Sequence, residues 1–231
     1  MTSSLKFKND DIIVISSKYV SMSEGAVLEL NKIRVSKKAR VLAARFQMDP
    51  KIAEITIRES DYILGGISGF LLAIRDGMIA PNAGIDKSNV PPGFIILYPN
   101  DAFKSAEHLK SKFLTYRKIR VGIVIADSRL MPTRIGTVGV AIGCAGFEPV
   151  EDERGKKDLF GNILQVTRKA VADGLASMGV AVMGEANEST PAVVIRGFKV
   201  TPTNRKLSKD DMTIDPSQDI YIRSLGHKLD I

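Results

Sequence analysis

Residues 120–128 read Arg-Val-Gly-Ile-Val-Ile-Ala-Asp-Ser, a run of strand-forming apolar residues that ends in a carboxylate and a hydroxyl. β-Branched residues favour strands, and a short apolar run bounded by polar residues is typical of a buried strand. We therefore predict a buried strand over residues 120–126. Residues 11–16 and 191–196 show the same pattern and are predicted as two further strands.

The segments around these strands mix helix and strand without a regular β-α-β alternation. Helices are predicted over residues 31–45, 49–60, 104–116 and 162–180, where the last contains Gly174 and Gly179 as expected points of close packing. A small polar loop or a short turn is expected over residues 16–25. The Asp76-Gly77 dipeptide lies between two apolar runs and predicts a hairpin.

This irregular order of elements favours an α+β fold with mixed or antiparallel sheets. We find no internal repeat and no flexible linker, so residues 1–231 are interpreted as one unit that ends in a polar segment over 198–231.

No apolar run approaches the ~18 residues that a membrane span needs. The N-terminus lacks the apolar region of a secretory signal. Cys144 is the single cysteine, which excludes an intrachain disulfide and fits a reducing cytoplasm.

The charge balance narrows the class of partner. The sequence has 33 Lys and Arg against 26 Asp and Glu, a net charge of +7. Such a basic protein can bind nucleic acid, a membrane surface or a small polyanionic substrate. The basic residues of segment 31–45 fit one solvated face of an amphipathic helix. Trp is absent and aromatic residues make up 6%, which argues against nucleic acid because its recognition uses stacking aromatics. His108 and His227 have no nucleophile partner in the sequence and are expected to be solvated.

Three acidic positions follow apolar segments and form the candidate site. Asp86 ends a turn of small and amide residues, Asp127 ends the quoted strand beside Ser128, and Glu185 follows the predicted helix over 162–180. Carboxylate and hydroxyl oxygens are ligands for hard divalent cations. Asp also commonly caps helices and turns, and a loop Glu commonly lies at the surface. The spacing alone leaves both interpretations open.

A set of short motifs occurs in a fixed order along the chain. In order they are Ala83-Gly84-Ile85-Asp86-Lys87-Ser88-Asn89-Val90, Ala126-Asp127-Ser128, Ala141-Ile142-Gly143-Cys144-Ala145-Gly146, Lys157-Asp158-Leu159-Phe160-Gly161, Ala172-Asp173, Met183-Gly184-Glu185 and Pro191-Ala192-Val193-Val194-Ile195-Arg196-Gly197. This ordered set resembles the coenzyme F(420)-0:L-glutamate ligases, which add γ-linked glutamates to a deazaflavin coenzyme with GTP. The resemblance implies two intertwined lobes, a homodimer and a cytoplasmic enzyme.

The resemblance also assigns residues. It implies that two divalent cations, Mg or Mn, are bound by Asp86, Asp127, Ser128 and Glu185, with the three carboxylates as catalytic residues. It further implies that the nucleotide contacts Ser17, Lys18, Asn89, Gly184, Glu185, Ala186, Asn187 and Glu188. The expected substrates are GTP, L-glutamate and the deazaflavin precursor.

The chain also departs from the pattern of this family. It starts about twenty residues late, Met22 stands where many members have a lysine, Ser128 replaces the usual threonine and Met131 stands where an arginine is common. Lys18, Arg129 or Lys156 are candidates to supply the missing positive charge. A ligase for another acceptor, or a homologue that binds nucleotide or deazaflavin without turnover, remain alternatives.

Overall fold

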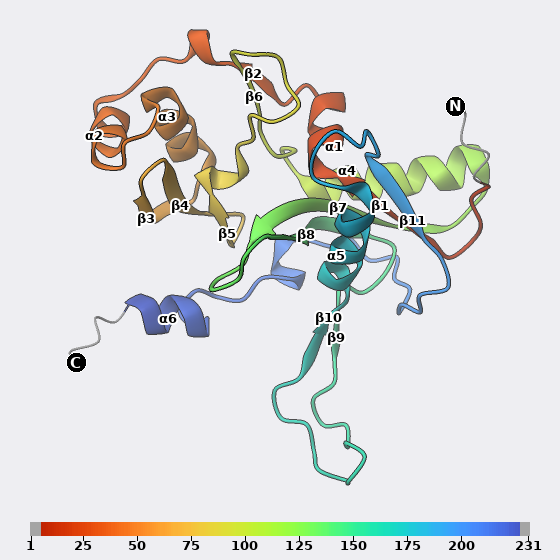
Figure 1. Cartoon of the computed structure of the whole chain (residues 1–231). Helices are drawn as coiled ribbons and strands as arrows, with labels where there is room; N and C mark the ends of the chain where they lie inside the picture. Colours follow the sequence, from red (N-terminus) through yellow and green to blue (C-terminus); the bar gives the residue numbers. More distant parts are fainter. Residues whose placement is uncertain (1–5, 227–231) are drawn as a thin grey trace. The chain divides into compact units, whose positions relative to one another are not determined.

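The computed structural model describes residues 6–226, and the chain forms two compact units (Figure 1). Unit 1 comprises Met1–Ala26 and Tyr98–Asp211, and unit 2 comprises Val27–Leu97 and Met212–Ile231. The chain therefore enters each unit twice. The α+β class with mixed and antiparallel sheets is confirmed, whereas the specific two-lobe ligase fold stays a prediction.

Unit 1 is built on a four-stranded sheet in the order β11-β1-β7-β8. Its strands are β1 (Asp11–Ser16), β7 (Val121–Leu130), β8 (Thr137–Ala145) and β11 (Ala192–Ile195). β1 runs parallel to β7, while the β1–β11 and β7–β8 pairs are antiparallel. The three predicted strands are thus present, and β7 continues four residues beyond Ala126. Residues 137–145, which include Gly139 and Gly143, form the strand β8.

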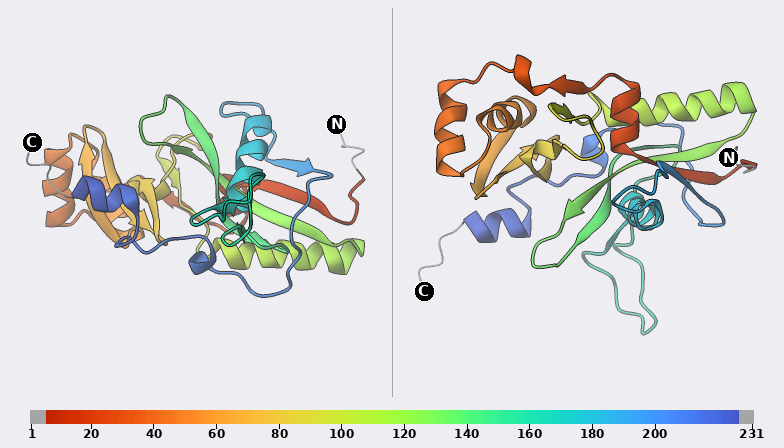
Figure 2. Two further views of the ribbon diagram at one scale, coloured as in Figure 1. Left: turned by 90° about the horizontal axis from the view of Figure 1, so that it is seen from below. Right: turned by 45° about the horizontal axis from the view of Figure 1, so that its top comes forward.

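Two helices cover opposite faces of this sheet. They are α4 (Ala102–Lys112), extended by a π-helical turn over Phe113–Arg117, and α5 (Val171–Met183) (Figure 2). The approach is close at glycines: a Cβ atom on Gly179 would lie 2.5 Å from Val14 Cγ1. Close packing at Gly179 is therefore confirmed. The same expectation for Gly174 is wrong, because a Cβ atom there would meet nothing within 4 Å.

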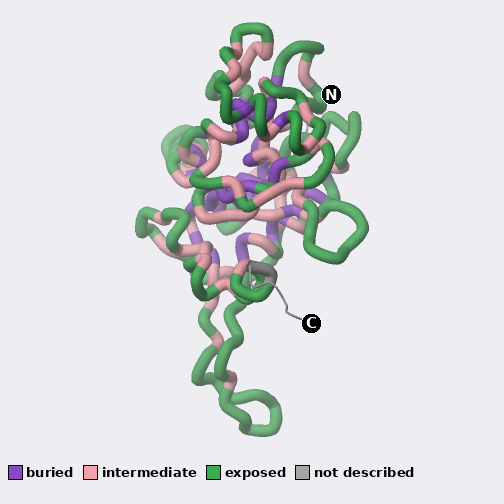
Figure 3. Tube along the Cα trace, turned by 90° about the vertical axis from the view of Figure 1, so that its left-hand side faces the viewer, coloured by how far each residue is buried: buried purple, intermediate pink, exposed green. Residues whose placement is uncertain are grey.

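The predicted helix over residues 162–180 is wrong in its first part, where the chain forms a two-stranded arm. Strands β9 (Val150–Asp152) and β10 (Arg168–Ala170) pair antiparallel, and the loop between them is exposed along most of its length (Figure 3). Asp158 Oδ1 accepts hydrogen bonds from the backbone N–H groups of Phe160 and Asn162, both 2.8 Å away. An Asp side chain that bonds its own following backbone competes with helix formation.

The predicted loop over residues 16–25 is also wrong, because α1 (Ser17–Ser23) occupies most of it. Its sequence, Ser-Lys-Tyr-Val-Ser-Met-Ser, has weak helix formers. Ser17, Val20 and Ser21 are buried, so packing on unit 1 compensates for weak local propensity. Two further short elements, in the C-terminal part of the chain, are η4 (Lys209–Asp211) and α6 (Ile220–Gly226).

Within its described residues, unit 2 contains two small sheets, the helices α2 and α3, and the short helix α6. The strands are β2 (Val27–Glu29) paired with β6 (Phe94–Ile96), and β3 (Tyr62–Ile67), β4 (Phe70–Arg75) and β5 (Met78–Pro81) in that order, with 3-10 turns at Leu30–Lys32 and Asn82–Gly84. The helices are α2 (Lys37–Arg45) and α3 (Pro50–Glu59). The predicted hairpin is confirmed, since Arg75 pairs with Met78 around Asp76 and Gly77, both at positive φ.

The start of α2 differs from the prediction of a helix over residues 31–45. Ser36 is the N-cap: its backbone is extended and its Oγ accepts from Ala39 N at 3.2 Å. Its own N–H donates to Glu54 Oε2 at 2.8 Å, and hydrogen bonds from Ser36 together with Arg58 lower the pKa of Glu54 to about 2. Residues 33–36 therefore lie outside the helix. The basic side chains Lys37, Lys38, Arg40 and Arg45 are exposed, as predicted.

The remaining predictions from the sequence concern the two histidines, the N-terminal segment and membrane-spanning helices. His108 is exposed on α4, as predicted, while His227 lies outside the described residues, as do residues 1–5 of the N-terminal segment that was expected to lack a signal. Over residues 6–226, the helices are too short or too polar to cross a membrane.

Candidate functional site

Asp127 lies near the end of β7 and is held by side chains from two other segments of unit 1. Ser17 Oγ, at the start of α1, donates to Asp127 Oδ1 at 3.1 Å. The phenol of Tyr98 donates to Asp127 Oδ2. β1 and β7 are parallel, so Ser17 at the end of β1 lies beside the carboxyl end of β7. The parallel register thus brings together a predicted nucleotide contact and a predicted metal ligand.

Tyr98 connects this carboxylate to a cation. Arg129 Nη2 donates to the Tyr98 hydroxyl oxygen at 2.9 Å. The tyrosine is 5% exposed, and burial, reinforced by the charge of Asp127, raises the pKa of its phenol above the ordinary value. The phenol therefore keeps its proton at neutral pH and acts as a hydrogen-bond donor.

A second carboxylate, Asp173, lies in the first turn of α5. Its Oδ1 accepts from Ala141 N of β8 at 2.9 Å. Burial raises the pKa of Asp173, while the bond from Ala141 and the charge of Arg129 act in the opposite direction. Asp173 belongs to the Ala172-Asp173 motif, and its side chain fastens α5 to the sheet.

Ser128 follows Asp127 in the strand, and successive strand residues point to opposite faces of a sheet. Its partner in the register is Gly139, where a Cβ atom would lie 2.4 Å from the Ala176 carbonyl oxygen of α5. Ser128 therefore lies on the α5 side of β7, and Asp127 and Arg129 on the other. The role of Ser128 as a metal ligand stays a prediction.

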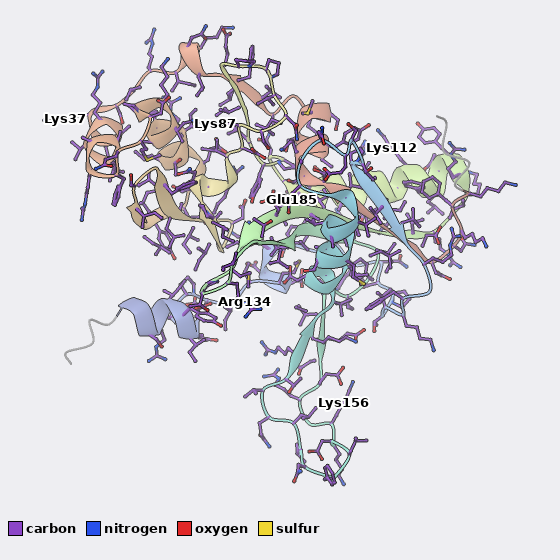
Figure 4. All side chains as sticks on the ribbon, in the orientation of Figure 1. Lys37, Lys87, Lys112, Arg134, Lys156 and Glu185 are labelled. Carbon is purple, nitrogen blue, oxygen red and sulfur yellow. The ribbon has the colours of Figure 1, made fainter. Side chains whose placement is uncertain are left out.

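Glu185 and its neighbours form the exposed loop that follows α5 (Figure 4). Thr137 Oγ1 donates to Glu185 Oε1 at 2.9 Å, which ties this loop to the start of β8. Glu188 Oε2 accepts from Ala186 N at 2.8 Å, and Gly184 has a positive φ of 80°. A side chain at Gly184 would collide with the Glu188 carboxylate. The loop is therefore folded around its own glutamate.

Asp86 and Asn89 lie in unit 2, in the turn that precedes β6. Asp86 Oδ1 accepts from Ser88 N at 2.6 Å, and Asp86 Oδ2 accepts from Ser88 Oγ at 3.1 Å. The backbone of Asp86 forms a bridge to Ile96, and Asn89 takes a left-handed φ of 55°. This is the turn geometry that Asp and Asn favour. The side chain of Asp86 is thus held by hydrogen bonds within its own turn.

The predicted site residues therefore fall into two groups. Unit 1 contains Ser17, Lys18, Asp127, Ser128 and the 184–188 loop, and unit 2 contains Asp86 and Asn89.

Lys156 is a predicted source of positive charge. It lies on the arm, and its Nζ pairs with Glu153 Oε2 at 2.7 Å. Within residues 6–226, no three acidic, cysteine or histidine side chains gather closely enough to form a metal cluster.

The chemistry of the group around Asp127 fits a hard divalent cation. Asp127 and Ser17 present carboxylate and hydroxyl oxygens, the kind of ligand that Mg²⁺ and Mn²⁺ take in proteins. The serine and tyrosine hydroxyls contact the two oxygens of one carboxylate. The agreement with a divalent-cation site rests on the carboxylate and serine oxygens.

The sequence interpretation missed Tyr98 as part of the site. Arg129 was considered only as a general source of charge. Tyr98 ends the apolar run Phe-Ile-Ile-Leu at residues 94–97. A tyrosine that closes a buried run needs a partner for its hydroxyl, which is the one signal that could have found it.

The chain is an α+β protein whose candidate site lies around Asp127 on a mixed sheet. A model of the F(420)-0:gamma-glutamyl ligase family matches residues 1–197, and the chain belongs to that family. The chain is similar to the coenzyme F(420):L-glutamate ligase of Methanopyrus kandleri, with 40% identity over 197 residues, 85% of this chain and 78% of the relative. The protein of that name from Methanocaldococcus jannaschii is 40% identical over 200 residues, 86% and 80% of the two chains.

Proposed function

We propose that this protein is a GTP-dependent ligase that adds L-glutamate through amide (γ-glutamyl) bonds to the deazaflavin coenzyme F(420)-0, in coenzyme F(420) biosynthesis. Family membership and relatives named as coenzyme F(420):L-glutamate ligases support an enzyme of this kind. The structural observation that supports the proposal is the 3.1 Å hydrogen bond between Ser17 and Asp127. It joins two residues that the family resemblance assigns to the nucleotide and to the metal.

The reaction requires activation of a carboxylate before an amide can form. The acceptor carboxylate oxygen attacks the γ-phosphorus of GTP, the bond to the β-phosphate oxygen breaks, and GDP leaves with the electron pair. The product is an acyl phosphate. The uncharged amino group of glutamate then attacks the acyl carbon, and inorganic phosphate leaves as the amide forms and the amine loses a proton.

The chain's own residues would bind and orient these anions. Asp127, Asp86 and Glu185, with Ser128, would hold two Mg or Mn ions, which supply charge neutralisation at the transferring phosphoryl group. Ser17, Lys18, Asn89 and the 184–188 loop would contact the nucleotide. A net charge of +7 suits three anionic substrates. A homodimer in the cytoplasm belongs to the same proposal.

The test is incubation of the purified protein with F(420)-0, L-glutamate, GTP and Mn²⁺ or Mg²⁺, followed by mass spectrometry. The proposal expects mass increments of one glutamate residue together with release of GDP. Parallel reactions replace GTP with ATP, omit glutamate, or supply other carboxylate acceptors.

The parallel reactions separate the alternatives. Increments on another acceptor alone would indicate a ligase with a different substrate. Saturable binding of F(420)-0 or GTP without any increment would indicate a binding protein without turnover. Either result would contradict the proposed activity.

A further inference from the structure

The feature that carries a further inference is the hydrogen-bond chain from Arg129 through Tyr98 to Asp127. Arg129 Nη2 lies 2.9 Å from the Tyr98 oxygen, and that hydroxyl contacts Asp127 Oδ2. Arg129 and Asp127 are two residues apart on β7 and therefore lie on the same face of the strand. The tyrosine approaches this face from the segment that follows β6.

The direction of each hydrogen bond follows from the chemistry of the end groups. A guanidinium can only donate hydrogen bonds, and an ionised carboxylate can only accept them. The phenol between them must accept from Arg129 and give its single proton to Asp127. The chain therefore has one allowed orientation, and it fixes one oxygen of the carboxylate.

The second oxygen is fixed independently. Ser17 Oγ donates to Asp127 Oδ1 at 3.1 Å, so the two carboxylate oxygens receive hydrogen bonds from different segments of unit 1. A carboxylate held at both oxygens cannot rotate about its side-chain bonds without breaking a contact. Tyr98 is 5% exposed, so water competes poorly for its hydroxyl.

We propose that Tyr98 is a positioning residue: its hydroxyl, polarised by Arg129, orients the Asp127 carboxylate for binding of a divalent cation. This inference rests on the proposed function in one respect, the assignment of Asp127 as a metal ligand. Residues that hydrogen-bond to ligating carboxylates orient them, and their loss typically costs about 10- to 100-fold in metal affinity or activity. Tyr98 itself is assigned no contact with the substrate.

The test compares Tyr98→Phe with Tyr116→Phe. Tyr116 is 77% exposed in the same unit, so its variant makes the same chemical change away from Asp127. Binding of Mn²⁺ to the protein with GTP is measured from the EPR signal of the free ion, without any turnover. Tyr98→Phe is expected to weaken Mn²⁺ binding about 10-fold or more, and Tyr116→Phe to leave it unchanged.

Kinetics provide the second measurement. In the ligation assay, Tyr98→Phe is expected to raise the Mn²⁺ concentration needed for half-maximal activity, and saturating Mn²⁺ restores most of kcat. An Arg129→Lys variant keeps a donor and is expected to lie between wild type and Arg129→Met. A thermal melt of each variant shows whether it is folded.

The outcomes are distinct. Unchanged Mn²⁺ affinity in a folded Tyr98→Phe variant overturns the inference, as does a wild type that binds no Mn²⁺ with GTP present. A wild type that binds Mn²⁺ but forms no amide overturns the proposed function alone, because the EPR comparison of the two phenylalanine variants still decides the role of Tyr98.

Discussion

Asp127 and Asp86 are both aspartates assigned to metal binding, but the structure holds them in different ways. Asp127 accepts hydrogen bonds from Ser17 and Tyr98, which lie 110 and 29 residues away in the sequence. Asp86 accepts from Ser88, two residues away, through both its backbone N–H and its hydroxyl. The first carboxylate is therefore positioned by tertiary structure and the second by its own turn. Mutations should affect the two positions differently.

The largest expected effect is a loss of ligase activity on substitution of either aspartate, which tests whether both carboxylates take part in one reaction. Asp127→Asn and Asp86→Asn should each lower kcat/KM by at least about a thousandfold, ~4 kcal/mol of transition-state stabilisation, because each removes a charge that would hold a cation. In the Asp86→Asn variant the new amide oxygen would still accept from Ser88, so the turn should persist. The measurement is the ligation assay with circular dichroism as a control. Retained activity in a folded Asp127→Asn variant would remove Asp127 from the metal site.

The next effect concerns a second carboxylate that is held by distant residues. Asp11 is fully buried, and Arg196 donates to both of its oxygens, from Nε at 2.7 Å and Nη2 at 2.8 Å. These bonds lower the pKa of Asp11. Arg196→Met should therefore lower the free energy of unfolding at pH 7, because it leaves a buried carboxylate without its main partner.

The sign of the pH dependence follows from that lowered pKa. The stabilisation by Asp11 is present above its unfolded pKa, about 3.9, and is lost as the pH falls through the lower folded pKa. Denaturant unfolding of wild type and Arg196→Met should therefore give a difference that is constant near neutral pH and shrinks below about pH 4. A difference that grows in acid would contradict this account.

A smaller effect is expected from the close packing of α5 on β1. Gly179→Ala should lower the free energy of unfolding by about 1–3 kcal/mol, since its Cβ atom would collide with Val14. Gly174→Ala is the matched control in α5, with open space around the new atom. It should be neutral or stabilise by up to about 1 kcal/mol through helix propensity. Equal effects at both sites in thermal or urea unfolding would refute the close approach of α5 to β1.

The smallest effect compares the two serines that donate to the two aspartates. Ser17→Ala should lower the free energy of unfolding by about 1 kcal/mol, because it removes a hydrogen bond that a buried serine makes between segments. Ser88→Ala should change it by less than about 0.5 kcal/mol, because Ser88 is exposed and its backbone N–H still donates to Asp86. A larger loss at Ser88 than at Ser17 would reverse the proposed distinction between tertiary and local support.

The same distinction explains what the sequence could predict. The strands β1, β7 and β11 were predictable because consecutive β-branched residues carry their own signal, and Asp76-Gly77 specifies its hairpin locally. Helix α1 was missed because its stability comes from burial of Ser17, Val20 and Ser21 and not from propensity. Residues 162–170 were misassigned because Asp158 and strand pairing oppose the helix there.

Some parts of the candidate site were likewise predictable from the sequence, and others required the tertiary structure. The motif order predicted the carboxylates, and the turn at Asp86 needed no tertiary information. The hydroxyl groups that donate to Asp127 come from residues 17 and 98, and no local pattern links these positions. A parallel β1–β7 register had to be known before Ser17 could be placed beside Asp127.

The parallel pairing of β1 with β7 has a consequence for how this chain can evolve. Parallel neighbours need a crossover connection, and here the crossover contains residues 27–97 of unit 2. Such a connection can change in length or sequence without altering any backbone hydrogen bond of the four-stranded sheet. The sheet of unit 1 therefore tolerates change over most of residues 27–97, whereas the roles proposed for Asp86 and Asn89 would restrict change at those two positions.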